Sequence, residues 1–124
     1  MRSERRHDEA DLVEHLRKEV NASRAALLWR NNTGLFCRIG APRIKVRCGL
    51  GTGSADLVGI LVGSGRGLAI ECKSPTGRLD PAQVCWRDVW IASGGLYVLA
   101  RSADVVLAAI CPDPWILTRP PGAE

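Results

Sequence analysis

Two apolar runs separated by a glycine-rich break constrain the fold of this chain more than any other feature. Residues 55–62 and 68–72 are aliphatic and partly β-branched, and the segment between them reads Gly-Ser-Gly-Arg-Gly. Glycine adopts the backbone conformations that a tight turn requires, so this pattern predicts a β-hairpin. We therefore expect a β-sheet at the centre of the molecule.

A helix is predicted ahead of this hairpin, over residues 8–22. Apolar side chains recur there at helical spacing and form one stripe. The stripe comprises Leu12, Val13, Leu16 and Val20.

A second helix is predicted after the hairpin. Asp80 is suited to cap its start, Pro81 to occupy its first position, and the helix should end near Ala92, before Ser93-Gly94-Gly95. Its apolar stripe is expected at Ala82, Cys85, Trp86 and Val89, with Gln83 at the edge of the stripe.

Further strands are expected at residues 25–29, 35–39, 44–48 and 96–99, and a short helix at 103–110. The order is helix, strands, helix, strand, helix. It predicts an α/β fold with a mixed central β-sheet flanked by helices.

Length and composition fit one intracellular domain. The chain has 124 residues, so we expect a single domain over 1–124 with its core at about 9–111. No apolar run approaches the ~20 residues that span a bilayer, and the first ten residues are too charged for a signal peptide. We therefore expect no membrane partner and a cytoplasmic location.

The cysteines and tryptophans carry no visible site. There are five cysteines, an odd number, and no pair has the C-x-x-C spacing, which argues against structural zinc and a disulfide framework. We expect reduced, mostly buried thiols. The four tryptophans are expected in the core rather than as platforms for stacking bases.

Positive charge is concentrated in one stretch. The net charge is only +4, but no acidic residue lies between Glu19 and Asp56. Such a one-signed stretch resembles a nucleic-acid footprint, although a solvated basic face without a partner fits the charge equally well. The basic residues of the stretch are Arg24, Arg30, Arg38, Arg43, Lys45 and Arg47.

The glycine-rich segment 49–54 does not match a nucleotide-binding loop. It lacks the Gly-Lys-Ser/Thr ending of a P-loop and the third glycine of a dinucleotide fingerprint, and a strand is predicted to follow it. We expect a close approach of its backbone beside a functional residue.

That residue is Asp56, at the start of the first hairpin strand. Glu71 and Lys73 lie near the end of the second strand, and side chains alternate along a strand, so both point to the same face. Two nearby carboxylates repel each other and are costly to bury, and a divalent cation removes this penalty. Oxygen ligands without His or Cys favour Mg²⁺ or Mn²⁺. A bare Glu-x-Lys is also common as a surface ion pair.

The surrounding segments favour a catalytic site. Residues 53–59, 69–73 and 77–83 read Gly-Ser-Ala-Asp-Leu-Val-Gly, Ala-Ile-Glu-Cys-Lys and Gly-Arg-Leu-Asp-Pro-Ala-Gln. This combination resembles the virus-type replication-repair nuclease (VRR-NUC) domain of the PD-(D/E)xK nuclease superfamily. The resemblance covers most of residues 9–100. One departure is that Ala55, not proline, precedes Asp56.

The resemblance implies a restriction-endonuclease-like core and a role for several residues. Asp56 and Glu71, with the backbone carbonyl of Cys72, would bind Mg²⁺ or Mn²⁺, Lys73 would be the catalytic lysine, and Gln83 would approach the site from its helix. The expected DNA-binding residues are Arg30, Asn32, Arg38, Arg43, Lys45, Arg47 and Arg87.

The family also uses a glutamate of the first helix. Glu9 falls near the centre of the apolar stripe, whereas Glu14 falls on the polar side, beside Arg17 and Lys18. A glutamate within a buried stripe needs a partner such as a metal or its water. We therefore expect Glu9 to act directly or through water; alternatively, Glu9 is a solvated acid at the helix start.

The resemblance implies a metal-dependent, structure-selective DNA endonuclease of replication, repair or recombination. Its substrates would be branched, flapped or junction DNA, and small relatives, many from phages and bacteria, often form homodimers. Two other interpretations are a non-catalytic DNA-binding module on the same fold and a sequence-reading restriction-type enzyme. The first leaves both acids unexplained, and the second lacks room for a base-reading element.

Overall fold

The computed structural model describes residues 2–110, with side chains from Glu9 onward. Cys111 and Trp115, and the predictions made for them, lie outside the described residues. In chain order the elements are α1 (Arg2–Ser23), β1 (Ala26–Arg30), β2 (Gly34–Arg38), β3 (Ala41–Cys48), β4 (Leu57–Leu61), β5 (Gly67–Cys72), α2 (Pro81–Ala92), β6 (Leu96–Ala100) and α3 (Ala103–Ile110).

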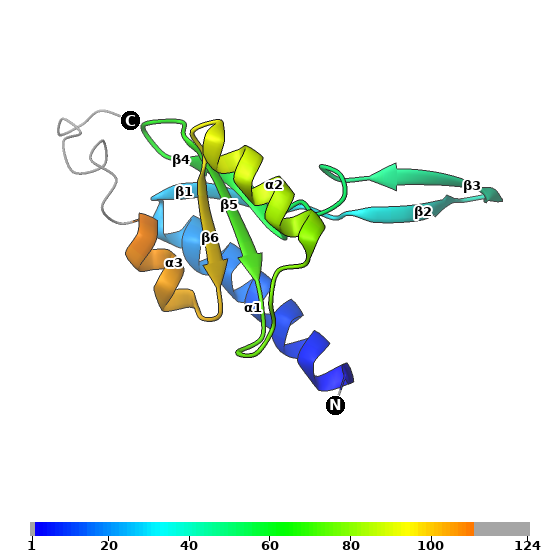
Figure 1. Ribbon diagram of the computed structural model, residues 1–124, viewed down its shortest axis with the longest axis horizontal. Helices are drawn as coiled ribbons and strands as arrows, with labels where there is room; N and C mark the ends of the chain where they lie inside the picture. Colours follow the sequence, from blue (N-terminus) through cyan, green and yellow to red (C-terminus); the bar gives the residue numbers. More distant parts are fainter. Residues whose placement is uncertain (1, 111–124) are drawn as a thin grey trace.

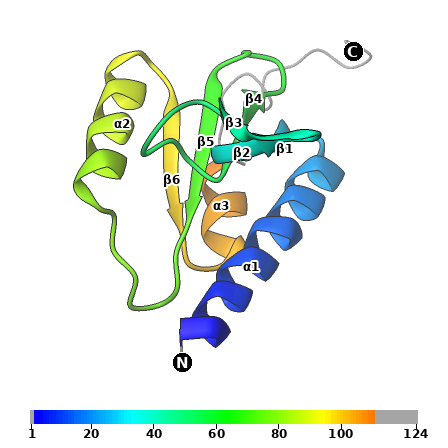
Figure 2. The same cartoon turned by 90° about the vertical axis from the view of Figure 1, so that its right-hand side faces the viewer.

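The central sheet is mixed, as predicted. Its strand order is β1-β4-β5-β6, with β1–β4 and β4–β5 antiparallel and β5–β6 parallel. The β4–β5 pair is the predicted hairpin. Helices cover both faces of the sheet: α1 and α3 lie on one side and α2 on the other (Figure 1, Figure 2). The predicted α/β class is confirmed.

The main core lies between the sheet and the pair α1–α3. Leu16 and Val20 of α1 and Val106 of α3 are fully buried there against Ile70 of β5. Burying such aliphatic side chains contributes roughly 1.5–3 kcal/mol each. The stripe predicted on α1 is confirmed, and the helix begins earlier than residue 8 because the charged residues before it are good helix formers.

A smaller cluster lies on the opposite face of the sheet, under α2. It contains Val58 and Ala69, with Trp86, Trp90 and Tyr97 packed against them. Since Ala69 faces α2 while its neighbour Ile70 faces α1, alternation along β5 directs Glu71 toward α2 as well.

The apolar stripe predicted for α2 is confirmed at Ala82 and Trp86, which are partly buried, but it is wrong at Cys85 and Val89. Cys85 is exposed and Val89 is 63% exposed, whereas Trp86 and Trp90 face the sheet with ring centroids 4.9 Å apart. Two indole rings bury more apolar area than a cysteine and a valine, so the helix turns them inward. Gln83 precedes Trp86 by almost one turn and therefore faces the sheet too.

Two expectations about buried side chains also need correction. Cys37 and Cys85 are exposed free thiols, although Cys72 is buried as expected. Trp29 is 49% exposed rather than part of the core. The reason is its position: β1 is an edge strand, and none of the described helices covers that part of the face on which α2 lies.

Strands β2 and β3 form a separate two-stranded sheet. They turn at Ile39 and Gly40, where Gly40 has a φ of 81°, and they project away from the rest of the molecule (Figure 1). Strand β3 begins at Ala41 and includes Pro42, because proline is tolerated on an edge strand. We call residues 34–48 the arm.

None of the described helices is both long and apolar enough to cross a membrane.

Candidate active site

The hairpin brings Asp56 next to the end of β5. Asp56 directly precedes β4, and one of its carboxylate oxygens, Oδ2, accepts a hydrogen bond of 2.8 Å from the backbone N–H of Cys72. The side chain of Cys72 points the other way, into the main core. Asp56 is thereby fixed beside Glu71, on the α2 face.

Asn31 holds the backbone around Asp56, and sequence analysis did not identify it as a site residue. Its backbone N–H donates to the carbonyl of Asp56 at 2.9 Å, and its side-chain amide donates to Ser54 Oγ and to the carbonyl of Ala55 at 2.9 and 2.8 Å. Residues 31–34 read Asn-Asn-Thr-Gly, a sequence typical of a turn. Which of these residues contacts the loop before β4 depends on the tertiary fold.

The glycine-rich loop packs against the start of α2. A Cβ atom at Gly53 would lie 2.3 Å from the carbonyl oxygen of Ala82 and 2.9 Å from the backbone nitrogen of Gln83. Gly53 also has a φ of 83°, which L side chains rarely adopt. The expected close backbone approach therefore occurs, and it joins the loop before Asp56 to the helix that carries Gln83.

Glu71 is the most buried acid of the site, at 3% exposure. Its Oε1 accepts a 3.0 Å hydrogen bond from Gln83 Nε2 and lies 3.7 Å from Lys73 Nζ. Its other oxygen, Oε2, is buried and has no hydrogen-bond partner among the described residues. Burial and the negative charge of Asp56 raise the pKa of Glu71 to about 8, and Lys73 only partly opposes this.

Gln83 reaches Glu71 in a fixed orientation. Asp80 caps α2 by accepting from the Gln83 backbone N–H at 2.9 Å, and the Gln83 side-chain oxygen accepts in return from the Asp80 N–H at 2.9 Å. This capping box occupies the oxygen of the amide, so its NH₂ group faces Glu71. The same side chain thus begins the helix and holds the buried carboxylate.

The first helix contributes Glu9 to the same end of the sheet. Glu9 Oε1 accepts a 3.0 Å hydrogen bond from the backbone N–H of Ser74, next to Lys73. Arg101 donates to the carbonyl of Ser74, so both backbone groups of this residue are held. Glu14 lies elsewhere: it pairs with Arg17 at 2.7 Å and with Lys18 at 3.9 Å.

Tyr97 is a second residue that sequence analysis missed. Its hydroxyl is buried and has no hydrogen-bond partner among the described residues. Its ring lies 6.3 Å from that of Trp86, under α2. Burial, followed by the negative charge of Glu71, raises the pKa of Tyr97 above its usual range. The site therefore contains a neutral phenol near the buried carboxylate.

Four of the expected DNA-binding residues lie on the arm and three do not. Arg87 forms an ion pair with Asp88 on α2, at 2.9 Å. The pKa of Glu14 on α1 is lowered mainly by the hydrogen bond from Arg17 and to a smaller extent by the positive charge of Arg30. Arg30 therefore lies on the α1 side of the sheet. Asn32 is exposed between β1 and the arm. The four on the arm are Arg38, Arg43, Lys45 and Arg47.

The donor set fits a hard divalent cation. No group of three or more His, Cys, Asp and Glu side chains forms a complete metal cage among the described residues. Asp56 and Glu71 nevertheless offer two adjacent carboxylates, and Glu71 Oε2 is buried with nothing to bind. Mg²⁺ is usually held by one or two carboxylates and several waters, so the residues present fit such an ion.

Residues 3–104 match the family model of the VRR-NUC domain. No curated protein matches the chain significantly. The matched segment includes the whole central sheet, α1 and α2, and the mixed α/β arrangement is that of a restriction-endonuclease-like core.

We predict that Glu71→Gln stabilises the metal-free protein at alkaline pH. The native-state pKa of Glu71, about 8, lies above the ordinary value of 4.5, so the native state binds its proton more tightly than the unfolded state. Stability from this group is therefore complete below pH ~4.5 and is lost as the pH rises toward ~8. Glu71→Gln should be more stable than the wild type by about 2–4 kcal/mol at pH 8.5 and nearly equal to it at pH 5.

Urea unfolding with a chelator at both pH values measures this difference. Glu19→Gln, at an exposed glutamate of α1, is the matched control and should follow the wild type. An equal pH dependence in the wild type and Glu71→Gln would contradict the burial of an uncompensated carboxylate.

Proposed function

Because this chain belongs to the VRR-NUC domain family, which is a family of nucleases, we propose that it is a metal-dependent, structure-selective DNA endonuclease. The observation that carries the proposal is the buried carboxylate of Glu71, which has one oxygen without a partner and lies beside a second acid, Asp56. A fold gains no stability from such a pair, so the pair is best explained by an ion that it binds.

The residues that would hold Mg²⁺ or Mn²⁺ are Asp56, Glu71 and the backbone carbonyl of Cys72. When bound, such an ion lowers the pKa of a water molecule and neutralises charge on a phosphoryl oxygen. The Asp56 carboxylate keeps Oδ1 available, since the Cys72 N–H occupies Oδ2. Glu71 offers Oε2, since Gln83 and Lys73 are at Oε1.

Lys73 is the cation best placed for the reaction itself. Its side chain is only 15% exposed and its ammonium group lies 3.7 Å from Glu71. Hydrolysis adds a water oxygen to phosphorus, breaks one P–O ester bond and leaves negative charge on the phosphate oxygens. An ammonium group at this position can orient the water and stabilise that charge. Gln83 acts differently, as a positioning residue that fixes Glu71.

Glu9 would complete the site through the loop that follows β5. Its carboxylate accepts from the Ser74 N–H and so ties α1 to the residue after Lys73. Its second oxygen would face a water of the metal. This role is proposed for Glu9 and not for Glu14, because Glu14 is engaged by Arg17 and Lys18.

The DNA surface would include the arm. The stretch from residue 20 to residue 55 contains no acid, and the arm carries four of its six basic side chains. Its root lies beside the active site, because the loop after β3 packs on the start of α2 (Figure 1). Branched, flapped or junction DNA in replication, repair or recombination is the proposed substrate.

A homodimer is proposed as the working form. An edge strand and its neighbour leave an apolar patch exposed on the α2 side of the sheet. Leu27, Trp29 and Ile60 are 55%, 49% and 41% exposed there. Leu27 pairs with Ile60 across the two strands and Trp29 follows Leu27 by two residues, so all three side chains lie on the same face of the sheet. A second copy would cover this patch and supply a second active site for the opposite strand.

A non-catalytic DNA-binding module is the alternative function. It would bind through the same basic arm, but it gives no reason for burying Glu71 beside Asp56 at a cost in stability.

We predict that Asp56→Ala, Glu71→Ala and Lys73→Ala each lower metal-dependent cleavage by about 100-fold or more, since each removes a group at the reacting phosphate. Cleavage of flap, fork and four-way junction substrates is measured with Mg²⁺ and with Mn²⁺, and circular dichroism reports the fold. Cleavage by Glu71→Ala at the wild-type rate would exclude the proposed mechanism.

We predict that Glu9→Gln loses most activity at saturating metal and that Glu14→Gln, its matched control on the same helix, loses little. The reason is that only Glu9 touches the loop after Lys73. Initial rates of both variants, compared at equal folded concentration, decide between the two acids. A larger loss of activity in Glu14→Gln than in Glu9→Gln would show that Glu14, and not Glu9, has this role.

We predict a dimer in sedimentation at micromolar concentration, and a shift toward monomer in Trp29→Ser. Val89→Ser, which changes another exposed apolar residue outside the patch, is the control and should stay dimeric. A wild-type protein that sediments only as a monomer would rule out the dimer.

A further inference from the structure

The arm has two chemically different faces. In its register, Leu35 lies opposite Arg47 and Cys37 opposite Lys45, whereas Phe36 lies opposite Val46. Opposite residues of an antiparallel pair share a face, so Lys45 and Arg47 lie on one face of the ribbon, together with Leu35 and Cys37.

The other face of the arm is apolar. Phe36 and Val46 are 48% and 47% exposed on it, and Ile44, two residues before Val46, is 49% exposed. Within residues 2–110, no third strand pairs with the arm and no helix packs on it. A two-stranded hairpin is marginally stable by itself, so three large half-exposed apolar side chains on one face call for a partner.

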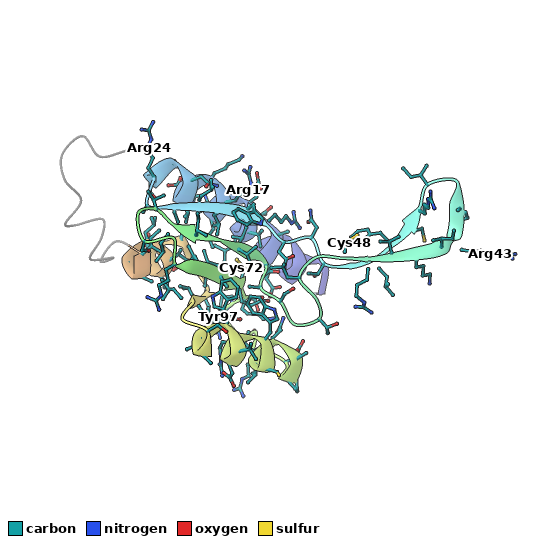
Figure 3. All side chains as sticks on the ribbon, turned by 90° about the horizontal axis from the view of Figure 1, so that it is seen from above. Arg17, Arg24, Arg43, Cys48, Cys72 and Tyr97 are labelled. Atoms are coloured by element: carbon teal, nitrogen blue, oxygen red, sulfur yellow. The ribbon has the colours of Figure 1, made fainter. Side chains whose placement is uncertain are left out.

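The tip of the arm carries the most exposed large hydrophobic side chain among the described residues. Ile39 is 101% exposed at the turn, ahead of Gly40. Arg38 precedes it, and Arg43 reaches beyond the far end of the arm (Figure 3). An isoleucine with one arginine before it and another four residues after it, at the end of a projecting ribbon, presents apolar surface close to positive charge.

We propose that the arm grips the branch point of a branched DNA. Its basic face, with Lys45 and Arg47, lies along backbone phosphates, while Ile39 and the apolar face cover bases that are exposed where strands part. This inference rests on the proposed function and names the part of the molecule that would select the substrate structure.

Charge favours DNA over a second copy of the chain as the occupant. Two arms packed on each other would bring eight cations together, since each arm has four and the stretch around it has no acid. Phosphates neutralise this charge instead. Apolar wedges inserted at base steps must usually unstack them, at a few kcal/mol per step. At a branch the bases already lack a neighbour, so an apolar tip gains contact without that cost.

The tip can be changed without altering the active site. Five residue steps from Gly34 to Ile39 correspond to about 17 Å of strand. Ile39 is fully exposed, so replacing it removes no contact that holds the fold. A change in DNA affinity on replacing Ile39 would therefore reflect a contact made in the DNA complex and not a change in the fold.

The test compares the affinity for a four-way junction with that for a linear duplex of the same sequence, without divalent metal so that nothing is cut. Ile39→Ser should lower the ratio of the two affinities by about tenfold, as expected for exposing one buried isoleucine side chain. Ile39→Leu should keep the ratio. Ile91→Ser, at an isoleucine 52% exposed on α2, is the matched control and should match the wild type.

Lys45→Ala with Arg47→Ala should weaken binding to both DNAs and flatten the dependence of log affinity on log salt by a slope of about 2. An unchanged junction preference in Ile39→Ser would overturn the proposal, and so would an unchanged salt slope in the double variant. Conversion of a DNA-free dimer to monomer by Ile39→Ser would also overturn it, because the arm would then bind a second copy.

These outcomes are separable from the proposed function. Metal-dependent cleavage by the wild type together with an unchanged ratio in Ile39→Ser would reject the arm inference alone. A ratio that falls in Ile39→Ser while the wild type cuts no DNA would reject the nuclease proposal and keep the arm as a branch-binding element.

Discussion

The burial of the Glu71 carboxylate is the constraint around which the rest of the site is arranged. Strand β5 must enter the core to hold the sheet together, and Glu71 enters with it on the α2 face, close to Asp56. Burying two neighbouring acids opposes folding, because desolvation and mutual repulsion both act against the ionised forms. Gln83 and Lys73 both contact Oε1 of Glu71, whereas Oε2 has no hydrogen-bond partner among the described residues and is the atom that we propose binds an ion.

Several contacts between residues distant in sequence fix the positions of Asp56, Glu71 and Lys73. Asn31 fixes the backbone before β4, Gly53 lets that loop touch α2, and the capping box of α2 orients Gln83. Glu9 ties α1 to the segment after β5. Each contact links a different element to the end of one hairpin. The site is therefore positioned by the sandwich as a whole, so the proposed reaction would need little reorganisation of these groups.

The arm contrasts with this rigid body. Among the described residues no helix packs on it, its large apolar side chains are all exposed, and its root lies at the candidate active-site end of the molecule. Under the proposed function the two parts would have different roles, in which the sandwich would cut the DNA and the arm would hold it. Its mixed chemistry, with Lys45 and Arg47 beside Leu35 on one face and Phe36, Ile44 and Val46 on the other, suits a nucleic acid that presents phosphates and bases at once.

The sequence by itself determined the hairpin, the cap of α2, the mixed α/β class and the shared face of Glu71 and Lys73. These depend on local spacing, turn glycines and strand alternation, which act over a few residues. It did not determine that Trp90 rather than Cys85 and Val89 would join Trp86 against the sheet, that Asn31 would hold Asp56, or that residues 34–48 would leave the body as an arm. Those outcomes depend on which surfaces meet, and only the packing of α2 and the edge strands against the sheet decides that, because burial is a property of neighbours far apart in the chain.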